Sequence, residues 1–297
     1  MSIIQNALDK ARQATGAGGC TGPQELSDTR KSDVAGLPER HRRIEIDIDQ
    51  LRAQGELPET GEEPRFADCY REIKRPLIQK ALAVGAHADA RLMLVTSALP
   101  AEGKTFTALN LALSIARERD VSVLLIDADV PKAHLSRTFG VQDEPGLMDA
   151  LGDETIDVES LVVGTNVPGL ELLPAGKAAE GAAELIASTR MAQICARLTG
   201  RYPRRMVLLD SAPLLVSSEA RALKQIPAQI LMVARAGRTP RQALLDAIAL
   251  LEKSRVYGLV LNDAHFTGGD GYYTHYGYST YGATERRRAA PEGRRSP

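Results

Sequence analysis

The stretch that decides the fold is Leu92–Thr105, which reads LMLVTSALPAEGKT. Its first six residues are an apolar, strand-forming run, and an amphipathic helical pattern begins at its end. The connection matches the phosphate-binding loop G-x-x-x-x-G-K-[ST], except that Ala98 replaces the first glycine. Such a loop points successive backbone N–H groups at a phosphate beside the positive end of a helix, and an alanine at its start does not prevent this. The stretch therefore predicts a phosphate site at a strand–loop–helix junction.

Within this loop the residue types suggest separate roles. We expect Gly103 to lie where the backbone approaches the anion, Lys104 to reach the β- and γ-phosphates, and Thr105 to present its hydroxyl to Mg²⁺. The alternative is an ordinary strand–turn–helix with an incidental Gly-Lys-Thr. The predicted nucleotide-binding residues of the loop are Ala98, Leu99, Pro100, Ala101, Glu102, Gly103, Lys104, Thr105 and Phe106.

On both sides of the loop, short apolar strands alternate with amphipathic helices. This alternation predicts an α/β fold with a doubly wound, mostly parallel sheet. Within the helices, Pro76 is expected to kink or divide the first one, and Thr239, Pro240 and Gln242 predict an N-cap, a first helical residue and a capping box. The predicted strands are 92–96, 121–126, 170–173, 206–209, 230–233 and 258–261, and the predicted helices are 66–82, 105–119, 183–198 and 240–253.

Three acidic residues follow two of the predicted strands. Asp127 and Asp129 come after VLLI, and Asp210 comes after VLL. Ligands of open α/β sheets lie beyond the carboxyl ends of the strands, so the three acids are expected to converge on Lys104 and Thr105. Taken singly, each acid is also typical of a helix cap or a turn. We expect Asp127 and Asp210 to lie in the Mg²⁺ shell, with Asp210 holding the ion directly or through water.

The composition excludes several classes of protein. The 297 residues are 43% hydrophobic and 25% charged with a net charge of −1, which is ordinary for a soluble globular protein and gives no basic field for nucleic acid. The three cysteines are widely separated, so a disulfide scaffold or zinc cluster is not expected and a reducing compartment fits. With no apolar run near the roughly 18–20 residues of a membrane span and no secretory signal, a cytoplasmic location is expected.

The chain divides into three parts by composition. Residues 1–65 are expected to be a flexible N-terminal docking or regulatory arm, residues 66–265 a packed domain, and residues 266–297 a disordered tail rich in Gly, Tyr and Arg. Five of the eight tyrosines of the chain lie between Tyr272 and Tyr281. This clustering indicates that tyrosine has a specific use in the tail.

Together, ALPAEGKT, LLIDAD, VLLDSAP and the tyrosine cluster resemble the bacterial tyrosine kinases of exopolysaccharide and capsule synthesis, over about residues 66–281. The segments MSIIQNALDKA and IDIDQLRAQGELP resemble the subgroup encoded with exosortase-linked polysaccharide loci. The resemblance implies a sheet of the P-loop NTPase type, ATP with Mg²⁺, and protein-tyrosine kinase activity directed at the chain's own tail. The implied phosphorylation sites are Tyr272, Tyr273, Tyr276, Tyr278 and Tyr281.

For catalysis the resemblance implies Lys104, Asp127, Asp129 and Asp210. Either Asp127 or Asp129 would accept the proton of the tyrosine hydroxyl, and a weak carboxylate base suffices because a phenol has a pKa of about 10. Asn262 would contact adenine, or is an ordinary turn asparagine.

The resemblance also implies partners. A helix motif E-x-x-R-x-x-R mediates ring-shaped self-association in the family, and Asp68, Arg71 and Lys74 occupy its positions here, although Lys cannot make the bidentate contact of Arg. The alternative for these residues is an ordinary solvated helix face. A separate membrane polysaccharide co-polymerase, or chain-length determinant, would activate the kinase and recruit it peripherally to the inner face of the cell membrane. A phosphotyrosine phosphatase would reset it, and no nucleic-acid partner is expected.

The position of the tail predicts transfer in trans within a homo-oligomer. About ten residues separate Asn262 from Tyr272, a flexible reach of roughly 17 Å, which is short for the same subunit's site. Phosphorylation would take the tail from a formal +2 to roughly −6 to −8, which predicts dissociation.

Two rival functions remain. One is a partition or septum-site ATPase, which carries a lysine near the start of the loop that this chain lacks. The other is a nucleotide-dependent scaffold for polysaccharide machinery.

Overall fold

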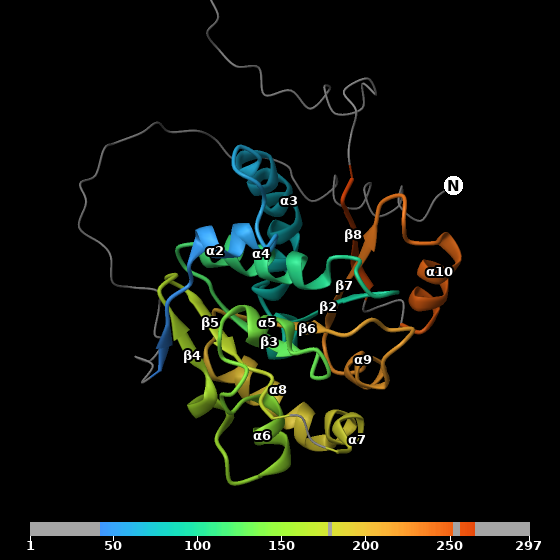
Figure 1. Cartoon of the computed structure of the whole chain (residues 1–297). Coiled ribbons are helices and arrows are strands. Elements are labelled where there is room, and N and C mark those ends of the chain that lie inside the picture. Colours follow the sequence, from blue (N-terminus) through green and yellow to red (C-terminus); the bar gives the residue numbers. More distant parts are fainter. Residues whose placement is uncertain (1–41, 178–179, 252–255, 265–297) are drawn as a thin grey trace, which may run out of the picture. The chain divides into compact units, whose positions relative to one another are not determined.

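The central element is a sheet of parallel strands that carries the phosphate-binding loop in its middle (Figure 1). The computed structural model describes residues 42–177, 180–251 and 256–264, and these form an eight-stranded sheet in the order β1-β4-β5-β3-β6-β2-β7-β8. Neighbouring strands are parallel except for the antiparallel pair β4 and β5. The strands are β1 (Arg43–Ile44), β2 (Leu92–Ser97), β3 (Ser122–Ala128), β4 (Val163–Thr165), β5 (Leu170–Leu173), β6 (Arg205–Ser211), β7 (Gln229–Arg235) and β8 (Val256–Asn262).

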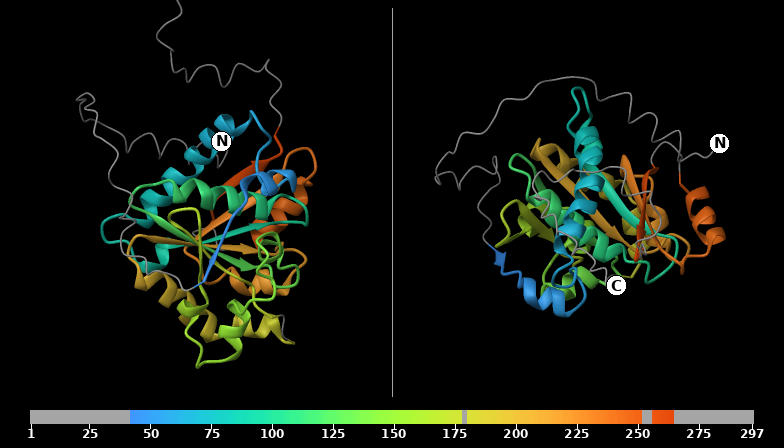
Figure 2. Two further views of the ribbon diagram at one scale, coloured as in Figure 1. Left: turned by 60° about the vertical axis from the view of Figure 1, so that its left-hand side comes forward. Right: turned by 90° about the horizontal axis from the view of Figure 1, so that it is seen from above.

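Helices cover both faces of the sheet, which confirms the predicted doubly wound α/β fold (Figure 2). Helices α2, α3 and α4 lie on one face, and α6 to α10 lie on the other. The helices are α2 (Ile48–Ala53), α3 (Glu63–Ala81), α4 (Lys104–Ala116), α5 (His134–Thr138), α6 (Leu147–Gly152), α7 (Ala182–Ala187), α8 (Thr189–Arg201), α9 (Ser218–Leu223) and α10 (Arg241–Ala249), with 3-10 turns η1 (Ala88–Arg91) and η2 (Val158–Leu161).

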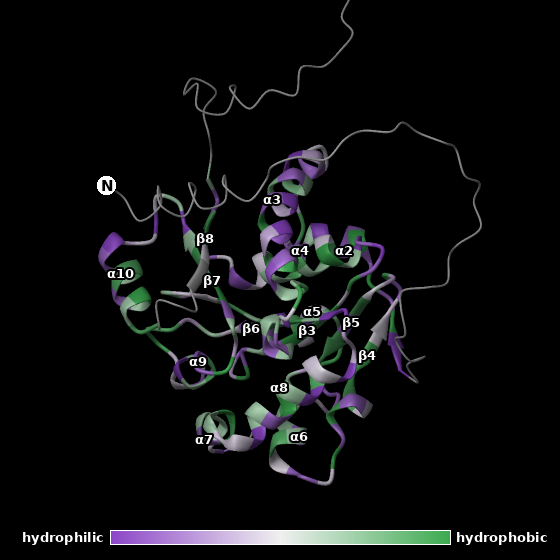
Figure 3. Ribbon diagram, turned by 180° about the vertical axis from the view of Figure 1, so that it is seen from behind, coloured by the Kyte–Doolittle hydropathy of each residue, from purple (hydrophilic) through white to green (hydrophobic). Residues whose placement is uncertain are grey.

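The central strands are apolar along their whole length because both of their faces are covered. All six residues of β2 are buried. Leu92 and Leu94 join the core under α6 to α10, whereas Met93 and Val95 join the core under α3 and α4. Strands β3 and β5 are mainly hydrophobic in the same way (Figure 3). Hydrophobic burial on two faces therefore fixes the strands whose carboxyl ends carry the polar loops.

The packed region begins earlier than the sequence predicted. Residues 42–65 were assigned to the flexible arm, but β1 pairs with β4, and Ile46, Leu51 and Leu57 are buried in the core beside α3 and α4. The Asn166 side chain accepts a hydrogen bond from the Ile46 N–H at 2.9 Å and donates one to the Ile46 carbonyl at 3.2 Å. Ile46 is thus a core residue and Ile44 packs against the core, whereas Ile48 is exposed. Residues 1–41 and 265–297 lie outside the described residues, so the predictions for them stay predictions.

Two helix predictions differ from the structure. Pro76 does not divide α3, which runs unbroken for 19 residues with Leu77 and Ala81 buried just beyond the proline. The helix predicted over 183–198 is two helices, because Ser188 adopts an extended backbone between α7 and α8 and its hydroxyl donates to the Leu185 carbonyl at 2.6 Å. Strands β1 and β4, of two and three residues, are too short to give a sequence pattern.

Candidate active site

The phosphate-binding loop connects β2 to α4 in a conformation that requires glycine. Gly103 is the N-cap of α4 with φ of +91°, in the left-handed region that non-glycine residues rarely adopt. A Cβ atom on Gly103 would lie 1.9 Å from Asn262 Nδ2. The motif glycine is therefore fixed by its backbone angle and by the close approach of β8. Lys104, the first residue of α4, is buried.

The end of β8 supports the loop. Asn262 donates from Nδ2 to the Glu102 carbonyl at 3.1 Å. Arg235, at the end of β7, forms an ion pair with Asp263 at 2.9 Å and donates to the Ala101 carbonyl at 3.3 Å. Asn262 was predicted to contact adenine, and in this structure its amide holds the loop backbone. Arg235 and Asp263 were not predicted, although both follow the carboxyl ends of predicted strands.

Glu102 turns its side chain into the protein. It is buried, and its Oε2 accepts the Leu99 N–H at 2.8 Å while its Oε1 accepts the Thr239 hydroxyl. The predicted capping box at Thr239 is wrong, because the structure uses this hydroxyl to bind Glu102. Helix α10 begins at Arg241 after Pro240 without a side-chain cap, and Gln242 bonds instead to Asp246 at 2.7 Å.

The acidic residues meet at the carboxyl ends of β3 and β6. These strands are neighbours, and Asp127 is the register partner of Asp210. Both side chains are fully buried, and Asp129 is 3% exposed. Asp127 accepts from the Ser136 N–H at 2.8 Å and from the Ser136 hydroxyl at 2.7 Å, both at Oδ2. Ser136 therefore orients Asp127, a role that no sequence pattern indicated.

Burial sets the electrostatics of the two carboxyls. It raises the pKa of Asp210 to about 8, although the nearby Lys104 ammonium and Thr105 hydroxyl act to lower it. Burial also raises the pKa of Asp127, against the two hydrogen bonds from Ser136. Asp127 Oδ1 and both carboxyl oxygens of Asp210 accept no well-formed hydrogen bond in the described part of the chain. Buried oxygens without partners are costly unless a ligand completes them.

These unpartnered oxygens fit a hard cation. Mg²⁺ prefers oxygen ligands and keeps several waters, using one or two carboxylates together with substrate phosphates. Across residues 42–177, 180–251 and 256–264 there is no group of three or more His, Cys, Asp or Glu that would enclose a metal by itself. Asp127, Asp210 and Thr105 are therefore suited to Mg²⁺ that arrives with a nucleotide rather than to a permanently caged metal.

The predicted self-association motif on α3 is only partly exposed. Arg71 pairs with Asp68 along the helix, and both are exposed to solvent at that face. Lys74 is buried, donates to the Ser114 carbonyl at 2.6 Å and pairs with Glu118 at 2.8 Å. Lys74 therefore joins α3 to α4, which leaves Asp68 and Arg71 as the accessible part of the motif.

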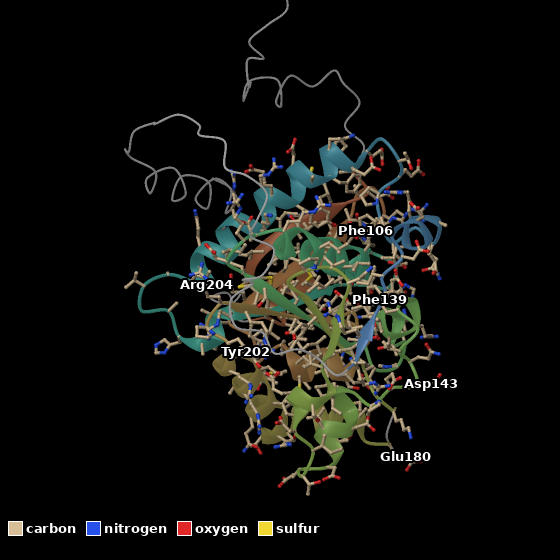
Figure 4. The ribbon with its side chains drawn as sticks, turned by 90° about the vertical axis from the view of Figure 1, so that its left-hand side faces the viewer. Phe106, Phe139, Asp143, Glu180, Tyr202 and Arg204 are labelled. Atoms are coloured by element: carbon tan, nitrogen blue, oxygen red, sulfur yellow. The ribbon has the colours of Figure 1, made fainter. Side chains whose placement is uncertain are left out.

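Phe106, a predicted nucleotide-binding residue, packs against α3. The Phe106 ring, labelled in Figure 4, packs edge-on against Phe66 of α3 with ring centroids 6.0 Å apart. This contact joins the first turn of α4 to α3. The five tail tyrosines lie outside the described residues.

The fold and the loop define a nucleotide-binding domain of the P-loop type, and comparisons with known proteins show the family to which it belongs. The kinase domain of VpsO is 30% identical with a TM-score of 0.55, and the match covers 67% of this chain and 99% of that domain. Tyrosine-protein kinase YwqD of Bacillus subtilis is 30% identical over 188 residues, which are 63% of this chain and 76% of YwqD. The chain belongs to the family of bacterial tyrosine kinases.

Another relative is longer than this chain. The putative tyrosine-protein kinase EpsB of Ralstonia nicotianae is 30% identical over 286 residues, which are 93% of this chain but 37% of EpsB. The chain matches no family model.

Proposed function

We propose that this chain transfers the γ-phosphoryl group of ATP to protein tyrosines, including those of its own C-terminal tail. The observation that carries the proposal is the pair of buried carboxylates, Asp127 and Asp210, set side by side with unpartnered oxygens next to Lys104. Membership in the tyrosine kinase family supports the same chemistry.

The chain's own residues divide the work as follows. The loop amides around Gly103 and the Lys104 ammonium bind and orient the phosphates, and Thr105, Asp127 and Asp210 hold Mg²⁺. When bound, Mg²⁺ neutralises charge on the phosphate oxygens. Asp127 or Asp129 accepts the tyrosine proton. Asp127 keeps only Oδ1 for this purpose, because Ser136 occupies its Oδ2.

Regulation is proposed to depend on assembly and on the tail. Subunits associate through the exposed Asp68–Arg71 edge of α3, and a neighbouring subunit phosphorylates the tail tyrosines in trans. A separate membrane polysaccharide co-polymerase activates the kinase at the inner face of the membrane, and a phosphatase resets it, so that phosphorylation controls polysaccharide synthesis or export. No helix within the described residues is long and apolar enough to cross a membrane.

A phosphorylation assay tests the proposal. Purified protein incubated with ATP and Mg²⁺ is expected to gain phosphotyrosine, and Lys104→Met is expected to abolish it because the β/γ-phosphates lose their cation. Lys80→Met is the matched control, since Lys80 is exposed in the last turn of α3. Phosphate release without phosphotyrosine would instead support a nucleotide-switched ATPase. Unchanged phosphotyrosine in folded Lys104→Met protein would refute the proposed role of the loop.

A further inference from the structure

We propose that Glu102 is a positioning residue that fixes the conformation of the phosphate-binding loop by joining Leu99 to Thr239. The inference rests on the proposed function only in assuming that this loop binds nucleotide. The contact concerned is a junction between the phosphate-binding loop and the turn that connects β7 to α10.

The junction is a set of hydrogen bonds that converge on the Glu102 carboxylate from two sides. The Arg235 N–H donates to Thr239 Oγ1 at 2.7 Å, the Thr239 hydroxyl donates to Glu102 Oε1, and the Leu99 N–H donates to Glu102 Oε2 at 2.8 Å. An ionised carboxylate only accepts hydrogen bonds, so the Leu99 N–H and the Thr239 hydroxyl must be the donors. Bonds to an ionised acceptor are also stronger than those between neutral groups. Glu102 is 3% exposed, so water competes little for these bonds.

The negative charge of Glu102 matters because the loop is expected to bind phosphates. A carboxylate within a loop that binds a polyanion would repel the ligand if it faced the same side as the loop amides. Here it faces the protein and occupies the Leu99 N–H, which is thereby withdrawn from phosphate binding. The loop amides that remain for phosphate are those nearer Gly103 and α4.

The loop backbone needs such support. Ala101 has φ of +61°, a left-handed conformation that is strained for a residue with a Cβ atom. Strained residues persist where surrounding contacts over-determine them. The Ala101 carbonyl accepts from Arg235, and its neighbour Glu102 is held at both carboxylate oxygens. The contacts from Arg235 and Thr239 therefore hold the loop in this strained shape.

Four variants and a control test the inference in the full-length chain. Glu102→Ala removes both bonds of the carboxylate. Thr239→Val removes the bond to Glu102 and also the Arg235 N–H bond to Thr239 Oγ1, whereas Thr239→Ser keeps the hydroxyl. Glu102→Gln keeps the volume and can accept from Leu99 while donating to Thr239. Gln242→Ala is the control, because its side chain is exposed and donates along α10 to Asp246 rather than to the loop.

Three readouts are needed: calorimetric affinity for a non-hydrolysable ATP analogue with Mg²⁺, amide exchange of residues 98–103 without nucleotide, and unfolding temperature. We expect Glu102→Ala and Thr239→Val each to weaken the affinity by about 10–100-fold and to speed exchange of the Leu99 amide. The double variant should bind no more weakly than Glu102→Ala alone. Thr239→Ser and Glu102→Gln should lie nearer the wild type.

Different results would overturn different statements. If Glu102→Ala binds the analogue like the wild type with unchanged Leu99 exchange, or lowers only the unfolding temperature, Glu102 does not position the loop. If the affinity losses of Glu102→Ala and Thr239→Val add, the two residues do not act as one junction. If the wild type itself binds no nucleotide, the proposed function fails, and the exchange measurement alone still decides whether Glu102 holds the loop.

Discussion

Replacing Gly103 with alanine should destabilise the protein through two separable effects. A non-glycine residue at φ of +91° costs about 1–2 kcal/mol. The added Cβ would also lie 1.9 Å from Asn262 Nδ2, so the Asn262 side chain must turn away and lose its 3.1 Å bond to the Glu102 carbonyl. That bond contributes about 1 kcal/mol. The sum is about 2–3 kcal/mol, or a drop in unfolding temperature of roughly 5–10 °C for a domain of this size.

Thermal and urea unfolding of a mutant cycle measures both effects. Asn262→Ala alone should cost about 1 kcal/mol, and the Gly103→Ala/Asn262→Ala double variant should cost about 2–3 kcal/mol rather than the sum of the single costs. Gly140→Ala is the matched control, since Gly140 has φ of +66° and open space around its missing Cβ. It should cost only the backbone term and show no coupling to Asn262. Additive costs for Gly103→Ala and Asn262→Ala would refute the contact between β8 and the loop.

Two buried charged groups of β6, Asp210 and Arg205, should also affect stability in ways that can be measured. Because burial raises the pKa of Asp210 from 3.8 to about 8, the folded state holds a proton that the unfolded chain releases, so Mg²⁺-free protein should lose stability from about pH 4 to pH 8. Asp210→Asn should reduce this loss to the part contributed by Asp127, whose pKa burial also raises, and parallel stability–pH curves for both proteins would contradict the prediction. At the other end of β6, Arg205→Met should cost about 3–5 kcal/mol in urea unfolding, because it removes the guanidinium that pairs with the buried carboxylates of Glu159 and Glu171. Its affinity for nucleotide should be unchanged at a temperature where the variant is folded; a tenfold weaker affinity would show that this cluster supports the site.

Those parts of the fold that depend on local pattern could be predicted from the sequence. The buried strands β2, β3, β5, β6 and β7 and the edge strand β8 each give an apolar run, and the helical connections between them indicate parallel pairing. The amphipathic pattern predicts one helix over 183–198, whereas the extended backbone of Ser188 divides it into α7 and α8. Residues 42–65 are packed although the sequence predicts a flexible arm, because Ile46, Leu51 and Leu57 join a core cluster with distant strands and helices. The Ile46 backbone also bonds to the distant Asn166 side chain, a contact that no local pattern indicates.

The residues of the candidate site also fall into those that the sequence predicts and those that it does not. Lys104, Asp127 and Asp210 follow apolar strands, so the rule that ligands lie beyond the carboxyl ends of strands was enough to predict their neighbourhood. Ser136 and Thr239 could not be found this way, because each reaches the site through a tertiary contact with a residue nine or more positions away. For Thr239 the sequence offered a competing local explanation, the helix cap, and the tertiary contact prevailed.

Strand β6 shows at its two ends why burial alone does not define a functional site. At its start Arg205 is fully buried, yet it is paired with Glu159 and Glu171, bonded to the Leu198 carbonyl at 2.7 Å and stacked on the Tyr202 ring at 4.4 Å. Near its end Asp210 is equally buried, and neither of its oxygens accepts a well-formed hydrogen bond. The charge of Arg205 is balanced by two carboxylates within the protein. At Asp210 the effect of burial outweighs that of the Lys104 ammonium and the Thr105 hydroxyl, so its pKa is raised. Asp210 lies near Lys104 of the phosphate-binding loop, and a cation brought in with nucleotide would supply a further partner.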